Sequence, residues 1–295
     1  MKKYWTLLRI KISLAYFFPM VVGFTVAADK DPHLAPYRVV LAFLAFFCAS
    51  FFASTLNFYA DVEADREFRS RFKDMDLAKQ PFVTGEMSRL ETVLAFALSG
   101  AGAIVLSLLA GRRVGFYIIG FALVVGLFYS HPWFRLKARP LTDILCNVAG
   151  MGFTLIAGMS LGVSYLPPVL FLVWGGLFVT VLYIPSVVND VPYDGRAGYK
   201  TSGVFFGAER LLLSTVALTA AMVPLAVLVV LNGAAPWQFK AVVIIGTLAT
   251  IAGVAVVLHL WRPPHIDLNP NAVLIPMYAF IAFFLVYGVV MMARG

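Results

Sequence analysis

The sequence predicts an all-α integral membrane protein with nine transmembrane helices. Three observations indicate this fold class: 61% of the 295 residues are hydrophobic, only 13% are charged, and the mean hydropathy is +0.88. Soluble domains carry about a quarter charged residues, so a water-soluble globular domain is excluded. Intrinsic disorder is also excluded, because it requires low hydrophobicity and high net charge. Since no Pro/Ser-rich linker interrupts the chain, we expect residues 1–295 to form one membrane domain.

Nine apolar stretches are long enough to cross the ~30 Å of hydrocarbon in a bilayer. They cover residues 12–28, 37–60, 91–111, 114–132, 141–163, 168–189, 210–232, 238–260 and 272–292. The third and fourth stretches are joined around Gly111, which predicts a helical hairpin. The basic N-terminal segment is not followed by a small-residue cleavage site, so we expect no cleavable signal peptide.

The lysines and arginines are distributed unevenly between the two sides of the predicted membrane domain. Seventeen lie in the N-terminal segment and the even-numbered loops, and six lie on the other side. The positive-inside rule therefore predicts a cytoplasmic N-terminus and an external C-terminus, in the inner or cell membrane of a bacterium or archaeon. The net charge of +8 is explained by this topology, and we expect no nucleic acid partner.

The acidic residues are concentrated in two segments that follow the second and the sixth predicted span. Eleven of the fifteen either lie between Asp61 and Glu91 or are Asp190, Asp194 and Glu209. The positive-inside rule explains basic residues on this side of the membrane and says nothing about acidic ones. The acidic clusters therefore need a cause of their own.

Each acidic segment carries two aspartates spaced i, i+4. Asn57, Asp61 and Asp65 share one helix face if the second span stays helical to its end, and Asp190 and Asp194 repeat the spacing. Like charges at this spacing repel, so a cation should lie between them. Carboxylates without His or Cys favour Mg²⁺ over zinc, and Mg²⁺ often completes its shell with substrate phosphates. The pairs predict two similar four-helix units that hold a diphosphate between Mg²⁺ ions; the alternative for each pair is a solvated acidic loop.

Basic residues accompany both acidic pairs, as binding of a diphosphate requires. Arg135 and Lys137 lie between the fourth and fifth spans, Lys200 follows the second pair, and Arg66 and Lys79 follow the first. The alternative is that these residues only determine membrane topology.

These motifs resemble the UbiA superfamily of intramembrane prenyltransferases, and they follow the family's order along nearly the whole chain. Phe58 stands where many members have an acidic residue, Gln80 where Arg is usual, and Trp133 where some members have Lys. The residues that carry the resemblance are Asn57, Asp61 and Asp65; Gln80, Pro81, Thr84 and Gly85; Tyr129, Ser130, Pro132, Arg135, Leu136 and Lys137; and Asp190, Asp194, Gly198, Lys200 and Thr201.

The resemblance implies transfer of an isoprenyl group from a prenyl diphosphate to a hydrophobic acceptor, usually an aromatic quinone precursor, within the membrane lipid. It also implies two Mg²⁺ sites and cations that contact the phosphate oxygens, in cytoplasmic loops at about 61–90, 133–140 and 190–209. Tyr129 is expected either to stabilise an allylic cation through its ring or to anchor the membrane interface. The implied metal ligands are Asn57, Asp61 and Asp65 for one ion and Asp190 and Asp194 for the other, and the implied phosphate contacts are Arg135, Lys137 and Lys200, with Arg66 and Lys79 as further candidates.

Two other functions use similar residues. A terpene cyclase of the same superfamily would use the same metal motifs without an acceptor. An ion-coupled transporter would also carry intramembrane acids, but transporter sites lie near the bilayer midplane. The four aspartates are at span ends, which favours the enzyme.

Overall fold

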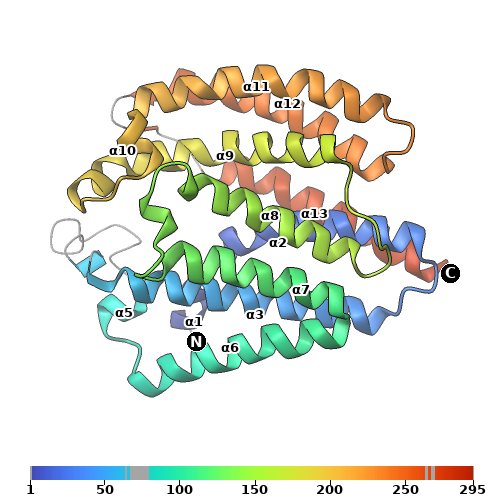
Figure 1. Ribbon diagram of the computed structural model, residues 1–295, viewed down its shortest axis with the longest axis horizontal. Helices are drawn as coiled ribbons and strands as arrows, with labels where there is room; N and C mark the ends of the chain where they lie inside the picture. Colours follow the sequence, from blue (N-terminus) through green and yellow to red (C-terminus); the bar gives the residue numbers. More distant parts are fainter. Residues whose placement is uncertain (1, 64, 67–79, 263–264, 267–269, 295) are drawn as a thin grey trace.

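The protein is described by a computed structural model that covers residues 2–63, 65–66, 80–262, 265–266 and 270–294. The predicted all-α fold class is confirmed: long helices run side by side along the molecule (Figure 1), and two short strands form an antiparallel pair near the C-terminus. In chain order the elements are α1 (Lys2–Leu8), α2 (Ile10–Lys30), α3 (Pro36–Ala60), α5 (Pro81–Thr84), α6 (Arg89–Ala110), α7 (Arg112–Phe121), the π-helix η2 (Ala122–Phe128), the 3-10 helix η3 (Leu136–Ala138), α8 (Thr142–Met159), α9 (Val169–Arg196), α10 (Ser202–Phe206), α11 (Ala208–Leu231), α12 (Trp237–Leu260), β1 (Trp261–Arg262), β2 (His265–Ile266) and α13 (Pro270–Ala293).

Within the described residues, eight helices are long and apolar enough to cross a membrane, so the predicted count of nine is not confirmed. The difference concerns the predicted span 114–132. Its residues form α7 followed by the π-helix η2, and neither piece alone reaches the length of a span. Helical backbone nevertheless continues from Arg112 to Ser130. π-helical turns are rare inserts in α-helices, and hydropathy cannot reveal them.

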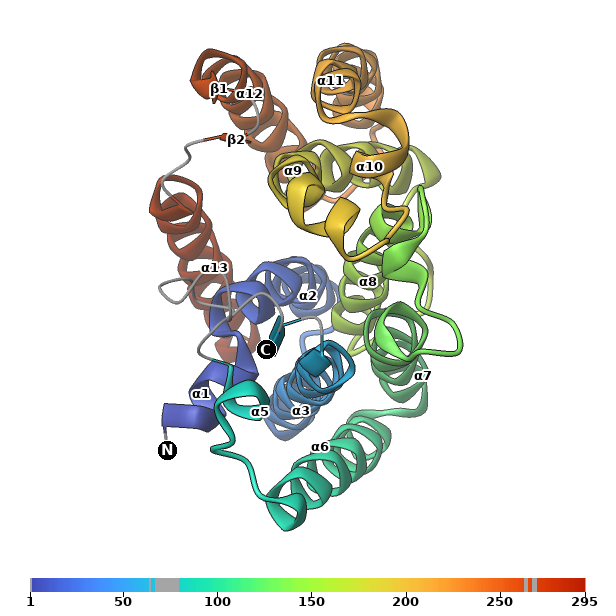
Figure 2. The same cartoon turned by 90° about the vertical axis from the view of Figure 1, so that its left-hand side faces the viewer.

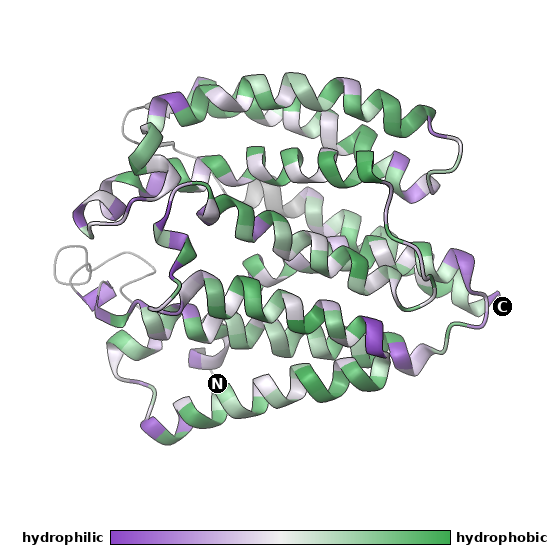
Figure 3. Ribbon diagram, viewed as in Figure 1, coloured by the Kyte–Doolittle hydropathy of each residue, from purple (hydrophilic) through white to green (hydrophobic). Residues whose placement is uncertain are grey.

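When the molecule is viewed along the helices, α2 and α3 lie in the middle, with α13 on one side and α7 and α8 on the other (Figure 2). Helix α2 packs against α8 and α13, α3 against α6, and α9 against α11 and α12. Apolar residues cover most of the helix lengths, and hydrophilic residues gather at the ends (Figure 3). The end at which α3 and α9 finish, on the left in Figure 1, carries both acidic segments.

Helices α2 and α8 approach so closely that two positions between them have room only for glycine. A Cβ atom at Gly158 would lie 2.1 Å from the carbonyl oxygen of Met20, and one at Gly23 would lie 2.1 Å from that of Leu155. Small residues allow such close backbone contact between membrane helices. This contact fixes α2, and with it the N-terminal segment, against the helix that follows the 133–140 loop.

Breaks in the helical backbone shape the end of the molecule that carries the acidic segments. Arg9, between α1 and α2, has φ 46° and ψ 54°, and Arg135 has φ 42° and ψ 49°. Both lie in the left-handed region, which non-glycine residues rarely occupy and which is often found at functional sites. The guanidinium groups of both residues contact the end of α3, Arg9 at Asn57 and Arg135 at Asp61.

Candidate active site

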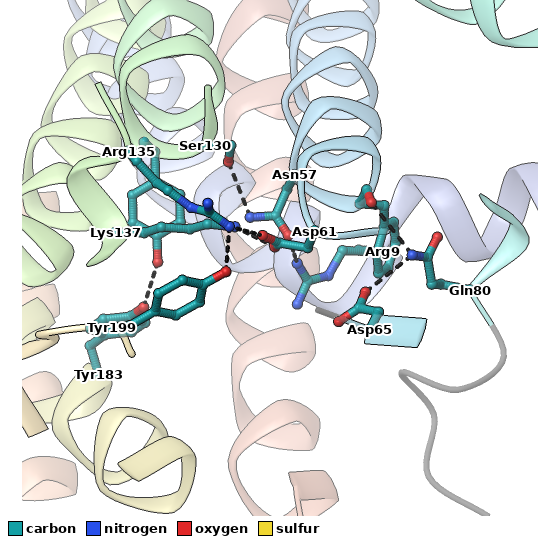
Figure 4. Close-up of polar contacts among 12 residues, drawn as sticks. Arg9, Asn57, Asp61, Asp65, Gln80, Ser130, Arg135, Lys137, Tyr183 and Tyr199 are labelled. Atoms are coloured by element: carbon teal, nitrogen blue, oxygen red, sulfur yellow. Dashed lines mark hydrogen bonds and ion pairs between the residues drawn. The ribbon is translucent and has the colours of Figure 1, made fainter. Parts of the chain in front are cut away.

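The last turn of α3 presents Asn57, whose side chain is held from two sides. Its amide Nδ2 donates to the Ser130 hydroxyl at 3.1 Å, and its Oδ1 accepts from the Arg9 guanidinium at 3.2 Å. Ser130 is fully buried. These two contacts fix the orientation of the amide, and they connect α3 with both the N-terminal segment and the end of the fourth predicted span (Figure 4).

Asp61, at the C-terminal end of α3, forms ion pairs with both cations of the 133–140 loop. The ammonium of Lys137 donates to Oδ2, and a guanidinium nitrogen of Arg135 lies 3.5 Å from Oδ1. Burial lowers the pKa of Lys137, and the Asp61 carboxylate opposes that shift. The structure therefore brings together Asp61, Arg135 and Lys137, which are 74 to 76 residues apart in sequence.

Asp65 lies one turn beyond Asp61 and is held by Gln80. The fully buried Gln80 amide donates to the carboxylate at 3.1 Å, and its own oxygen accepts from the Phe82 backbone at the start of α5. Burial, together with the neighbouring Asp61 carboxylate, raises the pKa of Asp65 to about 6. An added cation at this position would offset both effects.

The second pair, Asp190 and Asp194, lies on the last turns of α9, which continues to Arg196. Asp190 remains exposed and Asp194 is half-buried. Lys137 acts electrostatically on Asp194 as well as on Asp65, and Arg9 acts on Asp65 and Asp190. The same two cations thus lie within electrostatic range of both acidic segments.

Arg135 is held by Tyr199, which follows the second acidic pair. Its guanidinium lies 4.7 Å from the centre of the Tyr199 ring and donates to the phenol oxygen. Its Nε atom is buried and has no hydrogen-bond partner among the residues that the structure describes. A buried N–H of this kind has lost its hydration, so it is suited to donate to an anion that enters the site.

Tyr129 belongs to a group of polar side chains deeper among the helices. Its hydroxyl lies 2.8 Å from that of Tyr183 on α9. Nearby, the hydroxyl of Tyr16 on α2 donates to Asn147 on α8. The Tyr129 ring is therefore fixed within the bundle, and its hydroxyl is already bonded.

The remaining predicted phosphate contacts are less closely held. Arg66 and Lys200 are exposed, and Lys79 lies outside the described residues. Arg66, Arg135, Arg196 and Tyr199 line a cavity of about 1110 Å³ together with the apolar side chains of Phe52 and Phe96.

Comparison with known proteins shows which family has this sequence and this fold. Residues 16–284 match the UbiA prenyltransferase family. The chain belongs to the UbiA prenyltransferase family. The predicted resemblance and the predicted enzyme class are thereby confirmed at the level of the family.

Solved UbiA structures share the fold over the whole chain. A UbiA homolog from Archaeoglobus fulgidus bound to DMAPP and Mg²⁺ is 30% identical, covers 99% of both chains and superposes with a TM-score of 0.88. The same homolog bound to GPP and Mg²⁺ is 28% identical, also over 99% of both chains, with a TM-score of 0.88.

The chain is also similar to plant prenyltransferases, over part of their length. The chain is 27% identical over 187 residues, 60% of its length, to the chloroplastic 2-acylphloroglucinol 4-prenyltransferase of Humulus lupulus. It spans 43% of that protein's length.

The UbiA site has a donor set that fits Mg²⁺. Among the described side chains, no group of three or more His, Cys, Asp or Glu could by itself hold a metal ion. The candidate ligands instead offer hard oxygen donors as one amide, that of Asn57, and two pairs of carboxylates, Asp61 with Asp65 and Asp190 with Asp194. Mg²⁺ commonly uses one or two carboxylates and takes further oxygens from waters and phosphates. Each pair of carboxylates would supply part of the coordination shell of one Mg²⁺ ion, and the oxygens of a substrate diphosphate would supply more of it.

Arg9 and Tyr199 are site residues that the sequence did not predict. Arg9 is the more informative case. It precedes the first span among other basic residues, where the positive-inside rule is a sufficient explanation. The structure places its guanidinium on Asn57 and 5.2 Å from the centre of the Phe58 ring. The sequence contains one weak indication of this contact. Phe58 stands where many UbiA members have an acidic residue, and its ring face can contact a cation such as Arg9.

Proposed function

We propose that this protein is a Mg²⁺-dependent intramembrane prenyltransferase that transfers an isoprenyl group from a prenyl diphosphate to a hydrophobic aromatic acceptor. One observation carries the proposal: Lys137 contacts Asp61 of the first acidic segment and lies within electrostatic range of Asp194 in the second. Diphosphate departure requires this combination of carboxylates for metal ions and cations for phosphate oxygens.

The relatives support the substrate classes. The Archaeoglobus fulgidus homolog is bound to DMAPP or GPP together with Mg²⁺, which supports a prenyl diphosphate donor and a magnesium cofactor. The hop relatives are named for phloroglucinol acceptors, which supports an aromatic acceptor. A quinone precursor is one member of that acceptor class.

In this mechanism Asn57, Asp61 and Asp65 would hold one Mg²⁺ ion, and Asp190 and Asp194 would hold the other. Bound there, the ions would supply positive charge that offsets the charge of the departing diphosphate. The bond between C1 of the isoprenyl chain and the diphosphate oxygen breaks, and its electron pair leaves with the diphosphate. The acceptor's π electrons then form the new carbon–carbon bond, and the ring loses a proton.

The basic residues of this chain bind the departing anion. Lys137 is paired with Asp61 in the structure, and we expect its ammonium to contact the diphosphate once metal ions occupy the carboxylates. Arg135 offers its unpartnered Nε, and Arg9 lies on the opposite side of Asn57 from Ser130 (Figure 4). Lys200, Arg66 and Lys79 are further contacts in this proposal.

Tyr129 is placed to act on the hydrocarbon end of the donor. Its hydroxyl is bonded to Tyr183, so its ring face is the part left for an allylic cation, to which a ring of this kind is attracted. The helices around the ring exclude water, which would otherwise quench the cation.

The chain is an integral membrane protein, and we propose that its active site faces the cytoplasm. The basic excess on the side of the N-terminus supports this orientation. In the proposal residues 1–295 form one domain in contact with membrane lipid, and the segments 61–90, 133–140 and 190–209 form the site.

The proposal is tested by incubating purified protein with Mg²⁺, several prenyl diphosphates and a membrane lipid extract, followed by mass spectrometry of the products. We expect a prenylated acceptor and inorganic pyrophosphate. A hydrocarbon product formed from the donor alone would instead identify a terpene cyclase. Ion uptake into vesicles that persists without Mg²⁺ would indicate a transporter.

A further inference from the structure

Asp143 is a buried carboxylate outside the motifs that define the site. It lies in the first turn of α8 and is 2% exposed. Both of its oxygens accept hydrogen bonds from Ser202, the first residue of α10: Oδ2 from the backbone N–H at 2.8 Å and Oδ1 from the hydroxyl at 2.6 Å. Oδ1 also accepts from the backbone N–H of Ile144 at 2.9 Å.

These bonds make Asp143 a link between segments of its own chain. A carboxylate whose two oxygens already accept three hydrogen bonds at 2.6 to 2.9 Å is engaged with its own chain. Buried carboxylates are costly unless they are paired in this way, so the bonds to Ser202 account for its burial. Its function must be exerted through the segments that it connects.

The connected segments are the two loops that carry the proposed phosphate contacts. The hydroxyl of Ser202 also accepts from the backbone N–H of Leu141, a residue with φ 67°. Next to Leu141, the hydroxyl of Thr142 donates to the carbonyl of Leu136 at 2.6 Å. Two residues before Ser202, the backbone N–H of Lys200 donates to the carbonyl of Ala138 at 3.2 Å. Asp143 thus lies at the centre of a set of bonds that joins residues 136–142 to residues 200–202.

The left-handed backbone of Leu141 shows that this connection constrains the chain. A non-glycine residue adopts that conformation only where its surroundings enforce it. The hydroxyl of Ser202 binds the N–H of this residue, and Asp143 fixes the hydroxyl in turn. Lys137 and Arg135 lie a few residues before Leu141, and Tyr199 lies shortly before Ser202.

We propose that Asp143, acting through Ser202, is a positioning residue that holds the 133–140 and 190–209 loops in register, so that Lys137, Arg135 and Tyr199 converge on the diphosphate. The inference rests on the proposed function only for the identity of the anion. Residues that orient the groups contacting a metal or its ligands typically affect metal affinity by about 10- to 100-fold.

The test is binding of inorganic pyrophosphate in the presence of Mg²⁺, measured by calorimetry on the purified full-length protein. In Asp143→Asn the amide retains one acceptor oxygen, so in either orientation its NH2 group faces a backbone N–H that the carboxylate accepts from, that of Ser202 or that of Ile144. In Ser202→Ala the carboxylate remains and the hydroxyl is lost. We expect each variant to weaken pyrophosphate binding by about tenfold, and the double variant to add little, because the two residues act as a unit.

A matched control separates positioning from general loss of stability. Thr247→Ala removes another buried hydrogen bond, in which the Trp174 indole donates to the Thr247 hydroxyl at 3.0 Å between α9 and α12. We expect this variant to lower the melting temperature and to bind pyrophosphate as the wild type does. If Asp143→Asn does not fold, Ser202→Ala carries the comparison alone.

Wild-type pyrophosphate affinity in Ser202→Ala and in folded Asp143→Asn would overturn the inference, as would an equal loss of affinity in Thr247→Ala. Turnover is measured in parallel with DMAPP and GPP as donors. A wild-type protein that binds pyrophosphate but forms no prenylated product contradicts the proposed function, while the binding comparison still decides the role of Asp143.

Discussion

Arg9 contacts Asn57 and Phe58 at the point where the chain turns from α1 into α2. It is the cation that connects the N-terminal segment with both acidic segments. We expect Arg9→Ala to raise the KM for the prenyl diphosphate by about tenfold, because a hydrogen bond from a charged group is worth about 1.5–3 kcal/mol. Arg9→Lys retains the charge, so its KM for the prenyl diphosphate should rise less than that of Arg9→Ala. Steady-state kinetics at a fixed acceptor concentration measures the donor KM of both variants. An unchanged donor KM in Arg9→Ala would show that Arg9 is not part of the site.

Tyr199 holds Arg135 by both its ring and its hydroxyl. Tyr199→Phe keeps the ring beneath the guanidinium, and Tyr199→Leu removes both interactions. Since cation–π contacts contribute about 0.5–2 kcal/mol, we expect the Leu variant to raise the donor KM several-fold more than the Phe variant. Donor titrations on the two variants check this order. Equal effects would show that the ring contact does not orient Arg135.

The side chains of the site were predictable to different degrees. The i, i+4 spacing alone predicted that Asp61 and Asp65 share a helix face, and Lys137 was predicted to lie near an anion. The contact of Gln80 with Asp65 and that of Asp143 with Ser202 were not predicted. Both join segments 15 to 59 residues apart, and neither spacing nor composition encodes which buried polar groups meet after folding.

At the level of secondary-structure elements, the close contact between α2 and α8 is the most sensitive to side-chain size. We expect Gly158→Ala to destabilise the protein by about 1–3 kcal/mol, the usual cost of forcing extra atoms into a packed interior. The added Cβ would collide with the backbone of Met20, which cannot move aside as a side chain can. Thermal unfolding in detergent measures the effect.

Gly152 provides the control for that substitution within the same helix. A Cβ atom there would meet no atom of the described residues within 4 Å. Gly152→Ala should therefore not lower the free energy of unfolding. It should raise it by up to about 1 kcal/mol, because alanine favours a helix more than glycine does. Equal melting temperatures for the two alanine variants would show that α2 and α8 are not in backbone contact.

The helices themselves were predictable because long apolar stretches have one stable form in a bilayer, with backbone polar groups bonded within the helix. Eight predicted spans correspond to helices of membrane-crossing length. The π-helix after α7 was not predicted, because it changes backbone hydrogen bonding without changing hydropathy. The left-handed turns at Arg9 and Arg135 were also missed, since glycine is the residue usually expected there.

At the level of the whole molecule, the charge distribution predicts an orientation that labelling can check. Ala234 lies in the exposed turn between α11 and α12, and Glu86 lies in the exposed segment before α6. We expect Ala234→Cys to react with a membrane-impermeant maleimide in intact cells, and Glu86→Cys to react only after permeabilisation. The unsubstituted protein controls for Cys48 and Cys146. The reverse pattern would place the acidic segments outside the cytoplasm.

The central claim is that the two aspartate pairs hold Mg²⁺ for cleavage of a prenyl diphosphate. The most direct measurement is Mg²⁺-dependent release of inorganic pyrophosphate by wild-type protein, Asp61→Ala and Asp190→Ala, each shown to be folded in detergent. We expect wild-type release to stop on chelation of Mg²⁺, and each variant to lose at least about a hundredfold in rate, the cost of removing one group that stabilises developing charge. Near-wild-type release by both variants, or release that survives chelation, would contradict the account.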